Sequence, residues 1–260
     1  MQRLILFLDD GGVMNDNRLR TPQWQRLLGE FFPPRLGGSA EGWAEANRVY
    51  TEGLWDANRT WPECMAGLWR QGGETYAGFQ RQYQIEWLHG MCKLLDLPLL
   101  PADETVAMSQ QAVHFITRRV RAALPGVVGA IRSLKRAGYT LHTASGESSF
   151  ELDGYLTGMG VRDCFDRLYG PDLVDRLKDG PEYYRRILAD VRIDPSTAVF
   201  IDDSPMVVEW IRAAGAQAVL VGPATQTDGH SDAWLTLDSL ADLPGALSTP
   251  RGQSVDAPPQ

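Results

Sequence analysis

Two short apolar runs, far apart in the chain, each end in a pair of aspartates. Residues 4–8 run directly into Asp9-Asp10, and residues 199–201 run into Asp202-Asp203. Runs without polar residues are typical of strands that are covered on both faces of a parallel sheet. The ligand crevice of such a sheet lies outside the carboxyl ends of its strands. The two runs therefore predict neighbouring strands that gather carboxylates at one sheet edge, where a hard cation such as Mg²⁺ would relieve their repulsion.

Strand and helix signals alternate in the second half of the chain. We expect helices over 127–137, 150–159, 181–191 and 206–214, and strands at 139–143, 168–169, 198–201 and 216–221, the last of these being the final strand. Strands that alternate with helices of about ten residues are typical of a doubly wound parallel sheet. The predicted fold class is therefore α/β, with a Rossmann-like core. The strand at 4–8 must join this sheet, because alone it has no pairing partner.

The segment between the first strand and this second half shows a different residue pattern. Helical spacings dominate it, as in Trp24-Leu27-Leu28-Phe31, and six of the eight tryptophans lie there. Such aromatic residues could stack on a sugar or aromatic substrate, although at helical spacing they more often form a core. We interpret 17–121 as an inserted, all-helical cap domain and 1–16 with 122–247 as a discontinuous core domain. The remainder, 248–260, is rich in Pro, Gly, Ser and Gln and is expected to be a disordered tail.

Composition excludes several classes of partner. The formal net charge of −8 disfavours a nucleic-acid partner, which needs a basic face, and an anionic membrane surface. No stretch approaches the roughly 20 apolar residues that span a bilayer. The three cysteines form no C-x-x-C motif and are interpreted as reduced thiols. We therefore expect a cytoplasmic protein that binds neither nucleic acid nor membrane, and nothing in the sequence indicates its oligomeric state.

Four short motifs follow one another along the chain. They are Asp9 in D-x-G-G-V, Ser145 in T-A-S-G, Lys178 in L-K-D-G-P, and the pair Asp202-Asp203 in V-F-I-D-D-S-P-x-x-V-E-x-x-x-x-A-G. Their order and context resemble the haloacid dehalogenase (HAD) superfamily over residues 1–14 and about 122–222. The helical segment sits where that superfamily places its cap. The motif around the acidic pair is the most specific part of the resemblance.

The resemblance implies a set of site residues. Asp9 would be the nucleophile that accepts a phosphoryl group and forms a covalent intermediate. Mg²⁺ would offset the repulsion between this carboxylate and an anionic substrate. The implied metal ligands are Asp9, the backbone carbonyl of Gly11, Asp202 and Asp203. The implied substrate-binding residues are Ser145 and Gly146, which would contact a phosphoryl oxygen, and Lys178, whose compact positive charge would lie beside the phosphate and the nucleophile.

Gly11 departs from the superfamily's usual pattern. Its phosphatases usually carry a second Asp there, which protonates the leaving group and later activates water. Asp10 cannot replace it, because adjacent strand residues point in opposite directions. General acid–base assistance is typically worth about 10²–10⁴-fold in rate, although a good leaving group or another residue could compensate. The D-x-G-G opening is similar to that of sugar-phosphate phosphatase-like members.

The leading prediction is a Mg²⁺-dependent phosphatase that acts on a small phosphorylated metabolite through an aspartyl-phosphate on Asp9. Gly11 leaves open a weakened, HAD-like binding or regulatory protein. The 2-haloacid dehalogenases also lack the second Asp, but they dispense with the metal, and the intact pair Asp202-Asp203 argues against them. Phosphonate hydrolases need a cap lysine, and Lys93 stands in no motif. A phospho-receiver domain would carry its acidic pair near the N-terminus and its lysine near the end, the reverse of the order here.

Overall fold

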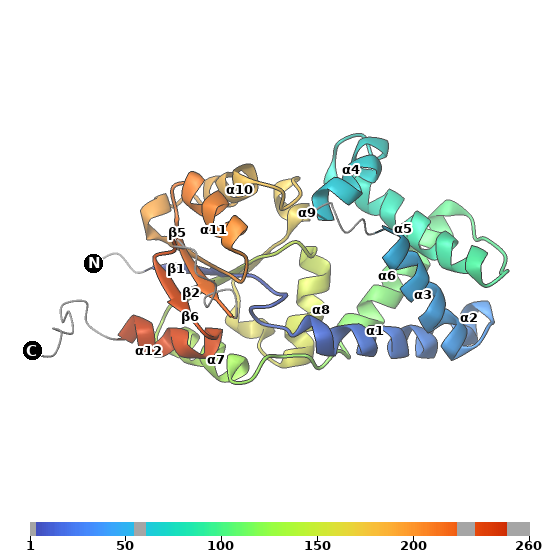
Figure 1. The fold of residues 1–260 in the computed structure, drawn as a ribbon, viewed down its shortest axis with the longest axis horizontal. Helices are drawn as coiled ribbons and strands as arrows, with labels where there is room; N and C mark the ends of the chain where they lie inside the picture. The colour runs from blue at the N-terminus through green and yellow to red at the C-terminus, as the bar shows by residue number, and fades with distance from the viewer. Residues whose placement is uncertain (1–3, 55–60, 223–231, 249–260) are drawn as a thin grey trace, which may run out of the picture.

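A six-stranded parallel sheet forms the centre of the protein. The computed structural model describes residues 4–54, 61–222 and 232–248 (Figure 1). Within these ranges the strands are β1 (Ile5–Leu8), β2 (Thr140–Ala144), β3 (Arg167–Tyr169), β4 (Ala198–Asp202), β5 (Gln217–Val221) and β6 (Leu235–Leu237). Their order is β3-β2-β1-β4-β5-β6, and each neighbouring pair is parallel. The predicted α/β class with a Rossmann-like parallel sheet is confirmed.

The first strand lies in the middle of the sheet. Leu8 is in register with Thr143 of β2 and with Ile201 of β4. The residue that follows β1 therefore emerges between the ends of two strands that come much later in the chain. This register places the first aspartate pair beside the second.

Helices cover both faces of the sheet (Figure 1). On one face, α7 (Val127–Arg136), α8 (Ser149–Met159) and α12 (Leu243–Ser248) pack on an apolar cluster that includes Leu6 and Leu8. On the other, α10 (Pro181–Val191) and α11 (Pro205–Ala213) pack on a cluster that includes Phe7. Successive strand residues point to opposite faces. A strand covered on both sides must be apolar throughout, which explains the first run of the sequence.

The sheet does not end where the sequence analysis expected. We predicted that 216–221 is the final strand, but β6 follows it, and the prediction was wrong on this point. Strand β6 has only three residues, and its side chains are partly or fully exposed because it lies at the sheet edge. A short edge strand carries neither a long apolar run nor a clear alternation. The short helix α9 (Pro171–Val174) was not predicted either, whereas the other predicted core elements begin and end within one residue of their expected bounds.

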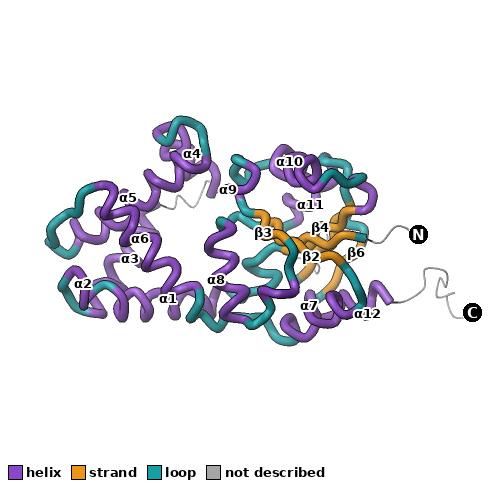
Figure 2. Tube along the Cα trace, turned by 180° about the vertical axis from the view of Figure 1, so that it is seen from behind, coloured by secondary structure: helices purple, strands orange, loops and turns teal. Residues whose placement is uncertain are grey.

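Six helices lie between β1 and α7 in the described chain. They are α1 (Asn17–Phe31), α2 (Pro33–Leu36), α3 (Ala40–Leu54), α4 (Trp61–Gln71), α5 (Tyr76–Leu94) and α6 (Ala102–Thr117). Figure 2 shows them gathered beside the sheet, with α8 at the junction. All of them except α4 contribute to an apolar cluster around Phe32, Trp43 and Trp87, and Tyr155 of α8 joins it. Helix α4 packs in a smaller cluster through Met65. The helical content predicted for this segment is confirmed, while its division from the core as a separate cap domain stays a prediction.

Two further predictions concern the C-terminal tail and membrane-spanning segments. Ser248 is the last residue of α12, and the rest of the predicted disordered tail lies outside the described residues. Among the described residues, no helix has both the length and the apolar character that crossing a membrane requires.

Candidate active site

Three carboxylates converge at the carboxyl ends of β1 and β4. Asp9, Asp202 and Asp203 each offer a carboxylate oxygen, and these oxygens lie within 4.8 Å of one another. Asp9 directly follows β1, and Asp202 ends β4. The parallel pairing of the two strands is what brings residues so distant in sequence together. The structure thus assembles the acidic edge that the two apolar runs predict.

Lys178 bridges two of these acids. Its Nζ lies 3.0 Å from Asp9 Oδ1 and 2.7 Å from Asp202 Oδ2. Burial works against the charge of this lysine, but the two carboxylates outweigh it and hold the pKa of Lys178 well above its usual value. The ammonium group is therefore a fixed positive charge beside Asp9. The sequence placed Lys178 in this site, and the geometry brings it there.

The acids carry more negative charge than one lysine neutralises. The pKa of Asp9 is raised to about 6. Burial is the main cause and the charge of Asp202 adds to it, while Lys178 opposes the rise. Burial also raises the pKa values of Asp202 and Asp203. Oxygen ligands at this spacing suit a hard divalent cation, whose charge would stabilise all three carboxylates. The donor set fits Mg²⁺, with Asp9, Asp202 and Asp203 as the side chains that could hold it.

The two glycines after Asp10 lie in contrasting surroundings. Gly12 has φ +79°, and a Cβ there would stand 1.9 Å from Asp203 Oδ2, so a larger residue would displace this carboxylate. At Gly11 a Cβ would stand 3.0 Å from Asn17 Nδ2 and 3.3 Å from Arg20 Nη2. Side chains of α1 therefore border the space into which the superfamily's second aspartate would project. The part of the Gly11 carbonyl in metal binding stays a prediction.

The Ser145 hydroxyl already has a hydrogen-bond partner within the protein. Ser145 is fully buried directly after β2, and its hydroxyl donates a 2.5 Å hydrogen bond to Glu147. Its backbone N–H donates to the carbonyl of Tyr169 at 3.1 Å. A phosphoryl oxygen would have to compete with Glu147 for the Ser145 hydroxyl. Phosphate binding by Ser145 and Gly146 stays a prediction.

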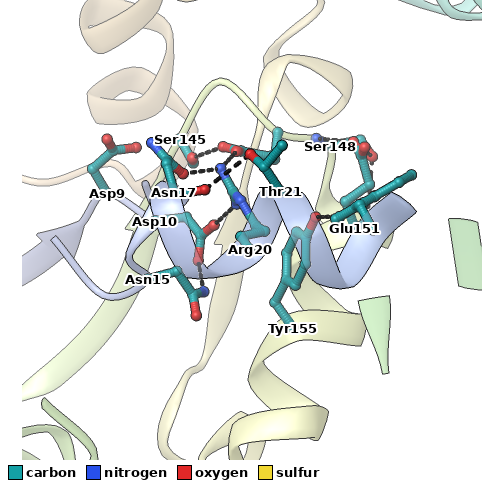
Figure 3. A network of polar contacts seen from close by, with 12 residues as sticks. Asp9, Asp10, Asn15, Asn17, Arg20, Thr21, Ser145, Ser148, Glu151 and Tyr155 are labelled. Atoms are coloured by element: carbon teal, nitrogen blue, oxygen red, sulfur yellow. Dashed lines mark hydrogen bonds and ion pairs between the residues drawn. The ribbon is translucent and has the colours of Figure 1, made fainter. Parts of the chain in front are cut away.

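A buried ionic network, which the sequence analysis missed, lies beside Asp9 (Figure 3). Arg20 on α1 donates to Asp10 at 2.6 Å and to Glu147 at 3.0 Å, and Asn15 donates to Asp10 at 2.7 Å. Burial raises the pKa of Asp10 to about 7, with Glu147 adding to the rise and Arg20 opposing it. The N-cap residue Asp16 marks where α1 begins but not the direction in which its first turn faces, so no signal in the sequence pointed to this network. The network ties the first helix of the insert to the loops that follow β1 and β2.

A cavity of about 300 Å³ lies beside the network, between the helical insert and the loop after β2. Gly146, Glu147 and Leu177 line its core side, and they neighbour Ser145 and Lys178 in the chain. The residues lining its other parts are Trp24, Tyr76, Phe79, Gln80, Tyr83, Gln84, Trp87, Val113 and Glu151. The sequence left open whether aromatic residues of the insert form a core or a ligand surface. Trp43 belongs to the core, whereas Trp24 and Trp87 also border the cavity.

Fold and site together define a class of α/β enzymes with an acidic, cation-compatible centre and a helical insertion after the first strand. A family model described as haloacid dehalogenase-like hydrolase matches residues 35–215, more than half of the sequence. The chain belongs to this family of hydrolases.

Relatives of known name are similar over part of the chain. Protein CbbY of Cereibacter sphaeroides is 29% identical over 152 residues, which cover 57% of this chain and 66% of the relative. The plasmid-encoded phosphoglycolate phosphatase of Cupriavidus necator is 28% identical, covering 59% and 68%. Hexitol phosphatase B of Escherichia coli K12 is 30% identical, covering 44% and 51%. The matches thus span between about half and two thirds of these relatives' lengths.

Solved structures share the fold at low sequence identity. The HAD-hydrolase YfnB of Bacillus subtilis, solved bound to magnesium, has a TM-score of 0.60 at 14% identity, covering 96% of this chain and all of that one. The L-2-haloacid dehalogenase of Xanthobacter autotrophicus has a TM-score of 0.59 at 15% identity, covering 95% and 98%. At these identities the likeness establishes the architecture alone.

Proposed function

We propose that this chain is a Mg²⁺-dependent phosphatase that hydrolyses small phosphate monoesters through Asp9. The observation that carries the proposal is the Asp9 carboxylate, 3.0 Å from the Lys178 ammonium and grouped with Asp202 and Asp203. Two of the relatives described above are named phosphatases, which supports the same reaction. A cavity of about 300 Å³ suits a small ligand.

The steps of phosphate-ester hydrolysis can be assigned to Asp9, Lys178 and a bound Mg²⁺. With a pKa of about 6, Asp9 is mainly ionised at neutral pH and can attack phosphorus. A bond forms between an Asp9 carboxylate oxygen and phosphorus, the ester P–O bond breaks, and its electron pair leaves with the alcohol oxygen, which takes a proton from water. Water then hydrolyses the aspartyl-phosphate and regenerates Asp9. Lys178 stabilises negative charge throughout, and Mg²⁺ held by the three aspartates would add Lewis-acid stabilisation of the phosphoryl oxygens.

A second candidate is a binding or regulatory protein with little turnover. Position 11 has no side chain, and Asn17 and Arg20 border the space that an acid would need. Such a protein would keep the cation site and bind phosphate analogues without hydrolysing esters. The dehalogenase alternative gains no support from the fold, since the likeness to dehalogenases carries no argument about reaction.

The test is a phosphate-release screen over a panel of monoesters, with and without Mg²⁺, on the wild type and on two matched variants. Asp9→Asn should abolish release. Asp238→Asn is the control, because Asp238 also follows a sheet strand directly but is exposed, and this variant should retain full activity. Retained activity in Asp9→Asn would refute the nucleophile assignment. Mg²⁺ and phosphate binding without hydrolysis of any ester would favour the binding protein.

A further inference from the structure

The walls of the cavity are largely aromatic. On one side Trp24 and Trp87 are in edge contact, with ring centroids 6.4 Å apart. On α5, Tyr76 and Phe79 lie 5.7 Å apart, and Phe79 stacks on Tyr83 at 6.0 Å. Aromatic pairs favour offset or edge-to-face contacts at these distances, so a further ring could join them.

The polar groups of the two tryptophans already have partners. Trp24 Nε1 donates to the Tyr155 hydroxyl at 2.7 Å, and Trp87 Nε1 donates to Asn47 Oδ1 at 2.9 Å. What these side chains offer a ligand is therefore ring surface and not hydrogen bonds. A sugar or hexitol carries a hydroxyl on nearly every carbon and would need many polar partners. The cavity offers the amides of Gln80 and Gln84, two tyrosine hydroxyls, and two glutamates that already accept hydrogen bonds from neighbouring residues.

The charges of the cavity disfavour a second anionic group on the ligand. Among its described lining residues there is no Arg, Lys or His, while two are glutamates. Glu147 is paired with Arg20 and accepts from Ser145. Glu151 accepts hydrogen bonds from Ser148 in a capping box. A carboxylate or second phosphate bound there would meet carboxylates and no cation.

The missing acid at position 11 points to the same kind of ligand. A leaving oxygen that ionises near the pKa of a phenol, about 10 as in tyrosine, departs without a proton far more readily than a water-like hydroxyl of pKa about 15.7. A phosphatase without this acid is therefore matched to an aryl ester. Gly11 and the aromatic cavity are independent features of the protein, and both favour an aryl ester as substrate.

We propose that the preferred substrate is an aryl phosphate, a monoester whose leaving group is an aromatic ring with no further negative charge. The inference rests on the proposed phosphatase function and narrows its substrate class. The ring occupies the cavity between Trp24 and Tyr83 while the phosphate reaches Asp9. The Asp9–phosphorus bond forms as the aryl P–O bond breaks, and the aryloxide leaves with the electron pair and later takes a proton from water. A second water then releases phosphate from Asp9.

Three esters separate ring binding from leaving-group chemistry in the wild type with Mg²⁺. We expect kcat/KM to fall from phenyl phosphate to benzyl phosphate by roughly 10²-fold, because benzyl alcohol needs the missing proton donor. KM should stay similar, because both carry a ring. Phosphoglycolate, with a second anion and no ring, should be the poorest. Turnover of phosphoglycolate or a hexitol phosphate as efficient as that of phenyl phosphate would overturn the proposal and leave the phosphatase function standing.

Variants test the cavity itself. Tyr83→Leu keeps apolar volume but removes a ring, and should raise KM for phenyl phosphate by roughly 2–10-fold. Tyr139→Leu is the control, since Tyr139 is a partly buried tyrosine that packs on the sheet cluster away from the cavity. Gln80→Arg places a cation on the wall and should raise kcat/KM for phosphoglycolate relative to phenyl phosphate. Equal effects of the two tyrosine variants, or no shift in Gln80→Arg, would contradict the placement of the ring.

Binding of phosphonate ligands tests the preference for an aromatic ring even if no ester is hydrolysed. Phenylphosphonate and methylphosphonate carry the same phosphonate group and cannot be cleaved as esters. Calorimetry with Mg²⁺ should give a dissociation constant for phenylphosphonate roughly tenfold lower, with the difference lost in Tyr83→Leu. Equal affinities would overturn the aromatic-ligand inference independently of turnover.

Discussion

Replacement of Gly12 by alanine, in the loop after β1, should displace the Asp203 carboxylate in the loop after β4. The new methyl group would stand 1.9 Å from Asp203 Oδ2 and 2.5 Å from its Cγ, so the carboxylate has to move. The backbone adds a cost of its own, because a left-handed conformation disfavours alanine by about 1–2 kcal/mol. Two effects are therefore expected: a small loss of stability, and a weaker cation site.

Gly215 supplies the matched control. Its φ is +90°, but a Cβ there would meet Pro195 at an ordinary 3.6 Å. Gly215→Ala should thus show the same backbone cost without disturbing any carboxylate. The difference between the two variants isolates the displacement of Asp203.

The assay is urea unfolding with and without Mg²⁺. At a Mg²⁺ concentration of 100 Kd, the wild type and Gly215→Ala should gain about 2.7 kcal/mol in unfolding free energy. If displacement of Asp203 weakens binding tenfold, Gly12→Ala should gain only about 1.4 kcal/mol. Full Mg²⁺ stabilisation of Gly12→Ala would refute the argument that Gly12 keeps Asp203 in a cation site.

Three further predictions concern the surroundings of the acids. Gly11→Asp alone should accelerate benzyl phosphate hydrolysis only slightly, because Asn17 crowds the new side chain. The double variant Gly11→Asp/Asn17→Ala should be faster than Asn17→Ala by up to roughly 10²-fold. Equal rates of the double variant and Asn17→Ala would show that the missing acid does not limit catalysis. Arg20→Met strands buried Asp10 and Glu147 and should lower the unfolding free energy by about 3–5 kcal/mol, whereas an unchanged urea midpoint would mean that the network is not stabilising. Burial lowers the pKa of His142 below its unfolded value of about 6.5. Between the two pKa values the unfolded chain binds the proton more strongly, so the unfolding free energy should fall as the pH falls, by at most about 1.4 kcal/mol per pH unit. His142→Asn should reduce this slope in urea titrations from pH 7 to 5.5.

The sequence predicted most elements of the core because the central strands are buried on both faces. Phe7 and its neighbours had to be apolar, and the aspartates after the strands could only emerge at the carboxyl edge. Lys178 was placed by its motif, and the pairing of β1 with β4 brought it to Asp9. Strand β6 escaped prediction because an edge strand of three residues leaves no periodic pattern.

The network around Arg20 could not be predicted in the same way. An arginine in the first turns of a helix is usually solvated, and only the direction in which α1 leaves the acidic loop brings Arg20 to Asp10 and Glu147. The bond from Ser145 to Glu147 likewise depends on how the loop after β2 turns. Whether aromatic residues face a core or a cavity depends on how helices pack against one another, which spacing alone does not determine.

The central place of β1 has a consequence for how the chain is made. This strand is synthesised well before both of the strands that flank it, β2 and β4. The intervening helices make mostly local contacts, which form fastest, whereas distant strand pairings are slow. We therefore expect a nascent chain truncated before β2 to have a helical insert already formed while β1 lacks both of its neighbours and depends on chaperones for protection.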